Sequence, residues 1–273
     1  MGVELTDRDF RRFAGLVHSK SGIRLHAGKM ELLRLRLGKR LRATGCNNFD
    51  EYYQYLTFED DGAELISMVD AITTNKTSFF RERRHFDFLD QRIFPALAAL
   101  ERRRARLRVW SAGCSSGEEP YSIAMTVLEF FRKQLPQEIL ILATDISRNM
   151  LQLAQNGIFP AAQVKVLSIT MQRRYFQKGY GLQEGFFRVK ENLRNMVVFE
   201  HQNLMNPFSF DQPFDLILCR NVMIYFDKTD KNKLVERFYS CLDDGGYLLI
   251  GQSESLTGMD HRFAYVEPSI YQR

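Results

Sequence analysis

Apolar residues in the first part of the chain recur every three or four positions, which is the spacing of amphipathic helices. Phe10, Phe13 and Val17 follow this spacing, and they come after Thr6, which can cap a helix. Residues 1–75 are therefore predicted to form a small all-helical domain. Its helices are expected from Thr6 to about residues 19–22 and over residues 26–44, 49–58 and 62–72.

The remainder of the chain alternates between helical spacing and short, almost wholly apolar runs. Such runs are typical of parallel strands that are buried on both faces. Because strands that alternate with helices form sheets covered on both sides, residues 76–273 are predicted to be an α/β domain with a doubly wound, Rossmann-like sheet. Its strands are expected over residues 109–112, 139–143, 214–219 and 247–251, with a last strand near the carboxyl end.

One stretch of this domain departs from the alternation. Glycines punctuate residues 179–185, apolar and basic residues alternate over residues 187–190, and another strand is predicted over residues 196–199. This pattern predicts an antiparallel hairpin or subdomain inserted at about residues 177–200. The insert is either a decoration of the fold or an exposed edge to which an incoming peptide can add as a strand.

The most informative stretch joins the first predicted strand to a helix through small residues. Residues 113–117 read Gly-Cys-Ser-Ser-Gly, which lets the backbone turn tightly. Glu118 and Glu119 follow in the first helical turn, where the helix dipole favours carboxylates. The run lacks G-x-G-x-x-G, and two glutamates would repel a pyrophosphate. A cationic or zwitterionic ligand therefore suits this loop better than a dinucleotide does.

The second predicted strand ends at Asp145. A carboxylate at this place binds ribose hydroxyls in α/β nucleotide folds. An adenosine with a positively charged tail, as in S-adenosylmethionine, satisfies both this observation and the one from the glutamate-containing loop. The alternative is an ordinary strand-to-helix turn whose two glutamates only complement the helix dipole.

The composition of the chain limits the classes of protein and of partner that are compatible with this interpretation. The chain has 273 residues, of which 45% are apolar, and no apolar run approaches membrane-spanning length. Its first residues have neither the basic nor the apolar region of a signal peptide, so we expect a cytoplasmic protein without membrane insertion. The four cysteines and five histidines are scattered, so no metal site is expected. The net charge of +5 permits either nucleic acid or an acidic protein as a partner.

The second predicted helix is strongly basic. Its polar positions are either a solvated face or a docking surface for an acidic partner. No aromatic residues are interleaved with the basic ones, which disfavours binding of single-stranded nucleic acid. Against the single Glu31, the helix carries Arg34, Arg36, Lys39, Arg40 and Arg42.

Residues 73–89 connect the two predicted domains. The segment begins with polar residues and continues with four phenylalanines, which are expected to pack. Asn75, Thr77 and Arg81 can then face a site. Alternatively, the segment is a plain connector whose Asn and Thr side chains cap a helix.

Together, these stretches resemble the chemoreceptor glutamate methyltransferase family, CheR. The order and spacing of five strings make the resemblance specific, and with the basic helix they span nearly the whole chain. The strings are NKTSFFRE (75–82), VWSAGCSSGEEPYSIA (109–124), ATDIS (143–147), FEHQNL (199–204) and FDLILCRNVMIYFDK (214–228).

The resemblance implies O-methylation of glutamate side chains on the cytoplasmic helices of bacterial chemoreceptors. The cofactor would be S-adenosylmethionine, and S-adenosylhomocysteine would be a product. The basic helix would meet the receptor, and the insert, in a compact form, would bind a peptide at the receptor's carboxyl terminus. We expect a monomer that requires no metal and has no nucleic-acid partner.

The resemblance also assigns roles to individual residues. Arg81 and Tyr225 would lie nearest the transferred methyl group, and they are the predicted catalytic residues. The cofactor would be bound by Asn75, Thr77 and Arg81 from the interdomain side, by Glu119 at its methionine portion, by Asp145 at its ribose, by Asn203 and Leu204 around its adenine, and by Arg220 and Asn221 after the fourth strand.

This chemistry suits the residues. A glutamate carboxylate is ionised at neutral pH, so it can attack a sulfonium methyl group without a general base. The enzyme then has chiefly to align the acceptor oxygen with the methyl carbon. Arg81 is a candidate to hold the acceptor carboxylate in a fork of hydrogen bonds, and Tyr225 to place its hydroxyl or ring near the sulfonium.

Two other functions stay open on the sequence. An N-methyltransferase acting on nucleic acid or on another protein usually carries a motif such as N-P-P-Y after the fourth strand, where this chain reads RNVMIYF. A non-catalytic adaptor that only binds the cofactor would not need Arg81 or Tyr225.

Overall fold

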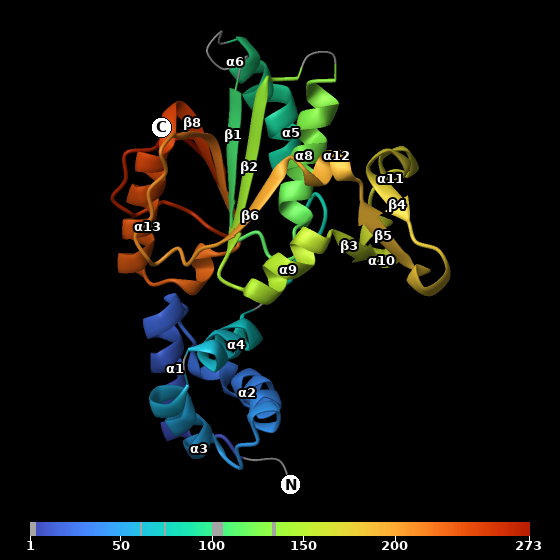
Figure 1. Ribbon diagram of the computed structural model, residues 1–273. Coiled ribbons are helices and arrows are strands. Elements are labelled where there is room, and N and C mark those ends of the chain that lie inside the picture. The colour runs from blue at the N-terminus through green and yellow to red at the C-terminus, as the bar shows by residue number, and fades with distance from the viewer. Residues whose placement is uncertain (1–3, 61, 74, 100–105, 133–134) are drawn as a thin grey trace.

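The computed structural model describes residues 4–60, 62–73, 75–99, 106–132 and 135–273. They form a helical amino-terminal domain, a domain built on a large twisted sheet, and a small β insert that projects from the side of the sheet domain (Figure 1). Within these residues, no helix is both long and apolar enough to cross a membrane.

The amino-terminal domain packs amphipathic helices around one apolar core. The side chains of Phe13, Leu37 and Tyr52 are fully buried there. Thr6 caps the first helix through a reciprocal pair of hydrogen bonds with Asp9, as the sequence predicts. The elements are α1 (Asp7–Ser21), a 3-10 turn η1 (Ala27–Lys29), α2 (Met30–Thr44), α3 (Phe49–Gln54), a π-helical turn η2 (Tyr55–Glu59) and α4 (Ala63–Ile72).

The second domain contains a sheet with the strand order β6-β2-β1-β7-β8-β10-β9. The first five of these strands run parallel, and β10 pairs antiparallel with both β8 and β9. The prediction of a doubly wound α/β sheet is confirmed. The strands are β1 (Arg106–Ala112), β2 (Glu138–Asp145), β6 (Val197–His201), β7 (Phe214–Cys219), β8 (Leu242–Ile250), β9 (Ala264–Glu267) and β10 (Ile270–Gln272).

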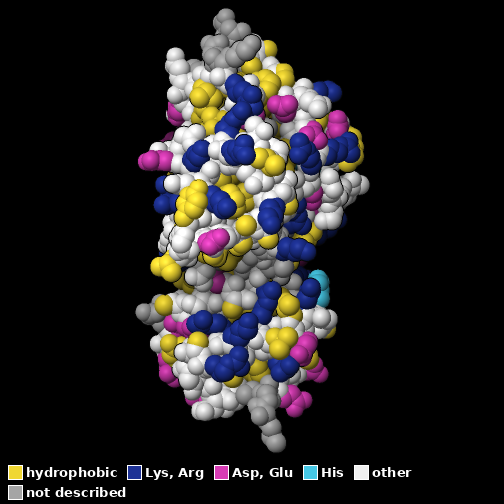
Figure 2. Space-filling view, turned by 90° about the vertical axis from the view of Figure 1, so that its right-hand side faces the viewer, with side chains coloured by type: hydrophobic (Ala, Val, Ile, Leu, Met, Phe, Trp, Pro, Cys, Tyr) yellow, Lys and Arg dark blue, Asp and Glu magenta, His cyan; other side chains and the backbone are white. Residues whose placement is uncertain are grey.

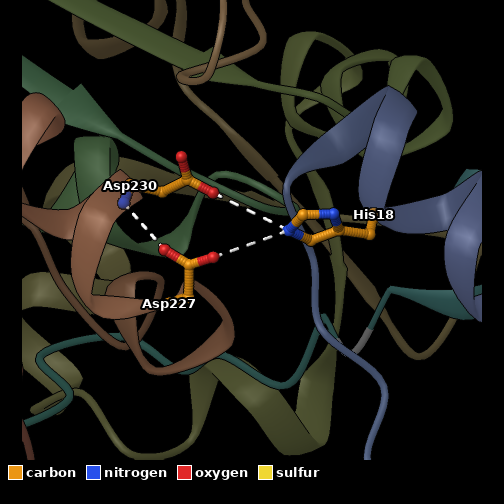
Figure 3. Close-up of side chains that lie close together, drawn as sticks. All are labelled: His18, Asp227 and Asp230. Atoms are coloured by element: carbon orange, nitrogen blue, oxygen red, sulfur yellow. Dashed lines mark hydrogen bonds and ion pairs between the residues drawn. The ribbon is translucent and has the colours of Figure 1, made fainter.

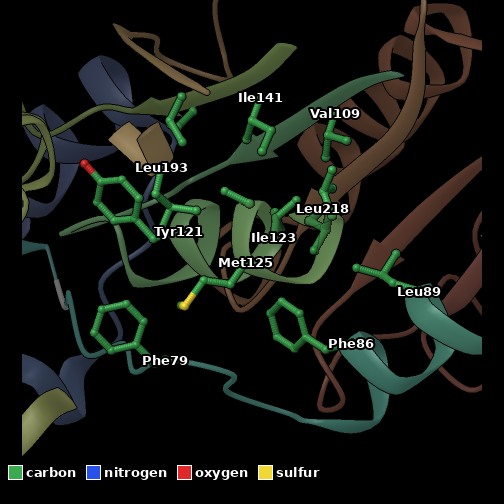
Figure 4. Close-up of a cluster of buried hydrophobic side chains, with 14 of the residues drawn as sticks. Phe79, Phe86, Leu89, Val109, Tyr121, Ile123, Met125, Ile141, Leu193 and Leu218 are labelled. Carbon is green, nitrogen blue, oxygen red and sulfur yellow. The ribbon is translucent and has the colours of Figure 1, made fainter. Parts of the chain in front are cut away.

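Helices cover both faces of this sheet because successive strand residues point to opposite sides. Val109 lies in the cluster that packs under α8, whereas Trp110 lies in the cluster that packs under α13. Figure 4 shows the first cluster, where Phe86 and Leu89 approach the sheet beside α8. The helices are α5 (Arg84–Phe88), η3 (Leu89–Ile93), α6 (Phe94–Ala99), α8 (Glu118–Phe130), α9 (Arg148–Asn156), α12 (Glu191–Arg194), η5 (Met223–Tyr225) and α13 (Lys228–Cys241).

The predicted antiparallel insert is confirmed, but it is built from other strands than the pattern indicates. Its sheet has the order β3-β5-β4, and the strand at Val197–His201 pairs with β2 of the main sheet instead. Residues 158–160 therefore pair within the insert and residues 197–201 do not, and the three-residue β3 is too short to leave a strand pattern in the sequence. The elements are β3 (Ile158–Pro160), α10 (Ala161–Val164), α11 (Ile169–Tyr175), β4 (Phe176–Lys178), η4 (Gly181–Gln183) and β5 (Phe186–Val189).

Candidate functional site

A cavity of about 400 Å³ lies between the helical domain and the carboxyl ends of the parallel strands. This is the edge where open α/β sheets bind their ligands. The volume is within the usual range for small-molecule sites. All ten site residues predicted from the sequence line this cavity: Asn75, Thr77, Arg81, Glu119, Asp145, Asn203, Leu204, Arg220, Asn221 and Tyr225.

The loop after β1 forms one wall, and its geometry depends on glycine. The amides of Gly113 and Cys114 both donate to the Thr144 carbonyl, at 2.8 and 2.9 Å, so the loop is fixed to the end of β2. Gly113 has a φ of +91°, and a Cβ atom there would lie 2.4 Å from Cγ2 of Val222. A larger residue would push apart two walls of the cavity.

Glu119 occupies the first turn of α8 and is held from two sides. Its carboxylate accepts from the Ser111 hydroxyl at 2.7 Å and from Nη1 of Arg220 at 2.9 Å, and its side chain is 12% exposed. Burial raises the pKa of the Glu119 carboxyl, although the Arg220 cation acts in the opposite direction. The helix start thus presents a carboxylate with a fixed orientation.

Arg220 joins three segments at the cavity. Besides Glu119, its guanidinium contacts the Glu82 carboxylate at 3.2 Å and the Arg81 carbonyl oxygen. Burial raises the pKa of Glu82, but Arg220 and the Asn221 amide more than offset this, so that pKa lies below its ordinary value. Because the Arg220 guanidinium is bonded to these partners, it stabilises the cavity wall and is not available as a free cation for a ligand.

Asp145 lies where β2 ends, as predicted for a ribose-binding carboxylate. Its two oxygens accept from the backbone amides of Ser115 and Ser147 at 2.8 and 2.9 Å. Burial raises the pKa of the Asp145 carboxyl. Each carboxylate oxygen has two lone pairs, so capacity is left for hydroxyl donors. Two part-desolvated carboxylates, on Asp145 and Glu119, therefore face one cavity, which fits a ligand with a polar sugar and a cationic tail.

The segment between the domains forms the roof of the cavity. The Asn75 carbonyl accepts from the Ser115 hydroxyl at 3.1 Å, and the Phe80 amide donates to the Ser122 hydroxyl at 3.0 Å. The predicted packing of the phenylalanines is confirmed, since Phe79, Phe86 and Phe88 are buried. Phe80 and Glu82 have positive φ angles of 52° and 55°, so this backbone is held in an uncommon conformation.

The helical domain also contributes to the cavity, which the sequence pattern did not reveal. Ile23, Leu25 and Lys29 line it. Two hydrogen bonds fix the domains to each other: the Asn203 side chain donates to the Lys20 carbonyl at 2.7 Å, and the Arg24 amide donates to the Tyr225 carbonyl at 2.9 Å. The helical domain is therefore part of the site and not only an attached module.

Beside this junction, one histidine and two aspartates lie together (Figure 3). His18 Nε2 is 3.8 Å from carboxylate oxygens of both Asp227 and Asp230, and the three side chains are close enough to share a metal ion. Asp227 is already engaged, because it accepts from the Asp230 amide at 2.9 Å and pairs with Arg24 at 3.0 Å. We interpret the cluster as an electrostatic contact between the domains, and the expectation of no metal stays a prediction.

The basic face of α2 is partly used within its own domain. Arg36 donates to the Ile72 and Thr73 carbonyls, and Arg40 forms an ion pair with Glu64. Lys39 and Arg42 remain exposed. Figure 2 shows Lys and Arg side chains on this side of the molecule, on the helical domain and on the sheet domain above it. A basic surface is present, but Arg36 and Arg40 contribute to it less than the sequence predicts.

Two carboxylates near the cavity, the partly buried Glu82 and the buried Glu254, were not among the predicted site residues. Glu82 belongs to the NKTSFFRE string, and its contacts to Arg220 and Asn221 were not foreseeable from spacing. Glu254 follows β8 by a few residues and is 9% exposed. The only available signal for Glu254 was an acidic residue just beyond the carboxyl end of a predicted strand.

Two family models match the chain in sequence. The model for the CheR methyltransferase all-alpha domain matches residues 8–73, and the model for the CheR methyltransferase SAM binding domain matches residues 75–271. The chain belongs to the CheR methyltransferase family. The cavity described above lies where these two matched regions meet.

Relatives within the CheR family match nearly end to end. A chemotaxis protein methyltransferase of Borreliella burgdorferi is 40% identical over 277 residues, which cover 100% of this chain and 96% of the relative. One from Salmonella typhimurium is 38% identical over 268 residues, which cover 98% of this chain and 90% of the relative. One from Escherichia coli is 38% identical over 269 residues, which cover 98% of this chain and 91% of the relative. The roles of individual cavity residues stay predictions.

Proposed function

We propose that this protein methylates glutamate side chains on the cytoplasmic domain of bacterial chemoreceptors and uses S-adenosylmethionine as methyl donor. The products would be glutamate methyl esters and S-adenosylhomocysteine. One observation carries the proposal: ten residues from five separate segments, selected in the sequence by its resemblance to CheR methyltransferases, line a single cavity at the carboxyl ends of the strands. Family membership and the names of the relatives support the receptor as substrate.

The cofactor, when bound, supplies a methyl group on a positively charged sulfur. The residues of the chain then have three tasks in this proposal. Glu119 and Asp145 provide negative charge and hydrogen-bond acceptors on one wall. Leu204 and Val222 exclude water from the apolar part of the cavity. Arg81, whose guanidinium donates to the Lys76 carbonyl at 2.8 Å, would orient the acceptor carboxylate through its remaining donors.

Alignment is the main contribution that the site has to make. The acceptor glutamate is ionised near neutral pH and needs no base. Holding the acceptor oxygen in line with the methyl group can supply several kcal/mol of the barrier reduction. Tyr225 lines the cavity, and its backbone is tied to Arg24 of the helical domain. In this proposal Tyr225 helps to fix the position of the methyl group.

Receptor docking is part of the same proposal. Lys39 and Arg42 present positive charge on α2 to an acidic helical surface, and Arg34 contributes less because it is paired with Glu31. The insert offers two edge strands, β3 and β4. Because β3 contains Pro160 and β4 contains no proline, β4 is the better edge for a receptor tail peptide to join.

The test is transfer of labelled methyl groups from S-adenosylmethionine to a chemoreceptor cytoplasmic fragment. Wild type would be compared with Arg81→Ala and Tyr225→Phe. The expected result is label on glutamate that is released in mild base, because methyl esters hydrolyse, and that falls at least about tenfold in Arg81→Ala. Base-stable label would instead indicate an N-methyltransferase. Tight cofactor binding without transfer to any of several receptor fragments would indicate an adaptor.

A further inference from the structure

The turn that follows β7 carries several of the cavity residues in irregular backbone. Asn221, Val222, Ile224 and Tyr225 all line the cavity. Asn221 has a φ of +59°, in the left-handed region that asparagine tolerates better than most residues with a side chain. The turn contains only one short 3-10 segment, so its shape has to be fixed by contacts from elsewhere.

Glu254 provides these contacts. Its Oε2 accepts from the Asn221 amide at 2.9 Å and from the Gly251 amide at 2.6 Å, and its Oε1 accepts from the Ile224 amide at 3.1 Å. The side chain is 9% exposed and does not line the cavity. One carboxylate thus binds both ends of the cavity-lining turn to the end of β8.

The approach of the two segments requires glycine on the β8 side. A Cβ atom on Gly251 would lie 2.6 Å from Nδ2 of Asn221 and 2.8 Å from Oε2 of Glu254. The Asn221 side chain then continues the chain of contacts, because its Nδ2 donates to Glu82 at 3.2 Å. Glu82 directly follows Arg81. The carboxylate of Glu254 is therefore linked to both predicted catalytic residues, through Ile224 to Tyr225 and through Asn221 to the Arg81 segment.

We propose that Glu254 is a positioning residue for methyl transfer: by binding the amides of Asn221 and Ile224 it fixes the turn that presents Tyr225 to the reacting groups. This inference rests on the proposed methyltransferase function. It concerns a residue that touches neither the cavity nor the reacting atoms.

A carboxylate is suited to this task in a way that a carboxamide is not. Glu254 receives backbone donors on both oxygens, whereas a glutamine at this position would turn an N–H donor toward at least one of these amides. The size of the side chain would not change. Glu254→Gln therefore removes the electrostatic match and keeps the volume, which separates positioning from packing.

Asp215→Asn is the matched control. Asp215 is 2% exposed, accepts from the Arg108 amide at 2.8 Å, and does not line the cavity. Both substitutions change a buried carboxylate that binds backbone amides at the same sheet. Only Glu254 is connected to the turn.

The experiment measures three quantities for wild type, Glu254→Gln and Asp215→Asn. They are the single-turnover rate of transfer to a receptor fragment at saturating S-adenosylmethionine, the affinity for S-adenosylhomocysteine, and amide hydrogen exchange over residues 220–226.

In Glu254→Gln the rate should fall about tenfold or more. Its affinity should change less than about threefold, because most predicted cofactor contacts lie on other segments. The Asn221 and Ile224 amides should exchange faster. Asp215→Asn should keep the wild-type rate and exchange pattern.

Unchanged exchange at these amides in Glu254→Gln would overturn the inference, as would a rate equal to that of Asp215→Asn at matched stability. If the wild type itself transfers no methyl group to any receptor fragment, the proposed function fails separately. The exchange and affinity measurements then still decide whether Glu254 fixes the turn.

Discussion

The guanidinium of Arg220 donates to the carboxylate of Glu119 at 2.9 Å, across the gap between the end of β7 and the start of α8. Only 2% of the Arg220 side chain is exposed. The same guanidinium contacts Glu82 in the segment that connects the domains. The Arg220 cation therefore joins three segments that line the cavity. Its removal would leave the carboxylates of Glu119 and Glu82 without their charge partner.

Replacing Arg220 with alanine should destabilise the fold strongly. Removing one partner of a buried ion pair typically costs about 3–5 kcal/mol, because the other charge is left desolvated and uncompensated. Urea denaturation of Arg220→Ala should show a loss of this size. The exposed pair between Arg262 and Glu236 is the control, and Arg262→Ala should cost less than about 1 kcal/mol. Equal losses in the two variants would contradict the interpretation of Arg220.

Stability should also depend on pH through His85, which is 1% exposed. Burial and the nearby Arg220 cation lower the pKa of His85 to about 4, although Glu82 acts in the opposite direction. In the unfolded chain a histidine has a pKa near 6.5, so the unfolded state binds more protons between these values. The stabilisation is complete above about pH 6.5 and is lost as the pH falls towards 4. Its size is about 3 kcal/mol.

The check is the free energy of unfolding of wild type and His85→Gln between pH 7 and pH 4. Glutamine can keep a hydrogen bond to the Ser269 hydroxyl, which lies 2.7 Å from His85 Nε2, but it does not titrate. Its stability should fall less steeply with acid. The exposed His26 serves as the control, and His26→Gln should follow the wild-type curve. If the free energy of unfolding of all three proteins falls equally with pH, His85 is not the cause of the pH dependence.

The main sheet and its wall of the cavity were predictable because their determinants are local. Each determinant is a local sequence feature that is typical of one position in an α/β fold: the apolar run of β7, the small residues after β1, and the acid at the end of β2. The fold then brings the carboxyl ends of these strands together. The ten predicted residues accordingly line one cavity. Periodicity alone would not have selected Asn203 or Leu204, which came from the resemblance to CheR methyltransferases.

What escaped prediction depends on contacts between distant segments. Glu254 lies 33 residues from Asn221, and nothing in either local sequence indicates the bond. Arg40 has the spacing of a surface residue on α2, yet Glu64 on α4 pairs with it. The strand Ile158–Pro160 is defined by its partner β5 and not by its own three residues. In each case tertiary pairing decides the structure, and single-segment patterns do not contain it.

Asp227 should prove to have two separable roles at the junction of the domains. It caps α13 by accepting from the Asp230 amide, and it pairs with Arg24 of the helical domain. Asp227→Ser keeps a capping hydroxyl and loses the charge, whereas Asp227→Ala loses both. Thermal unfolding should show a further loss of about 1 kcal/mol from serine to alanine, which is the usual value of an N-cap. Identical stability of the two variants would mean that the cap contributes nothing.

The exposed basic residues of α2 should govern receptor affinity without affecting the cofactor site. Lys39 and Arg42 project from the helical domain, whereas Arg36 and Arg40 are engaged within it. Lys39→Glu combined with Arg42→Glu should raise the KM for a receptor fragment about tenfold or more, because charge reversal weakens electrostatic association. The affinity for S-adenosylhomocysteine and the rate at saturating receptor should stay near those of wild type.

Two comparisons make this last prediction specific. Lys233→Glu changes an exposed charge on α13 and should leave the KM for the receptor near that of wild type. Raising the salt concentration should increase the wild-type KM and have less effect on the double variant, since screening removes an attraction that the variant already lacks. If Lys233→Glu weakens receptor binding as much as the double variant does, net charge determines docking rather than the surface of α2.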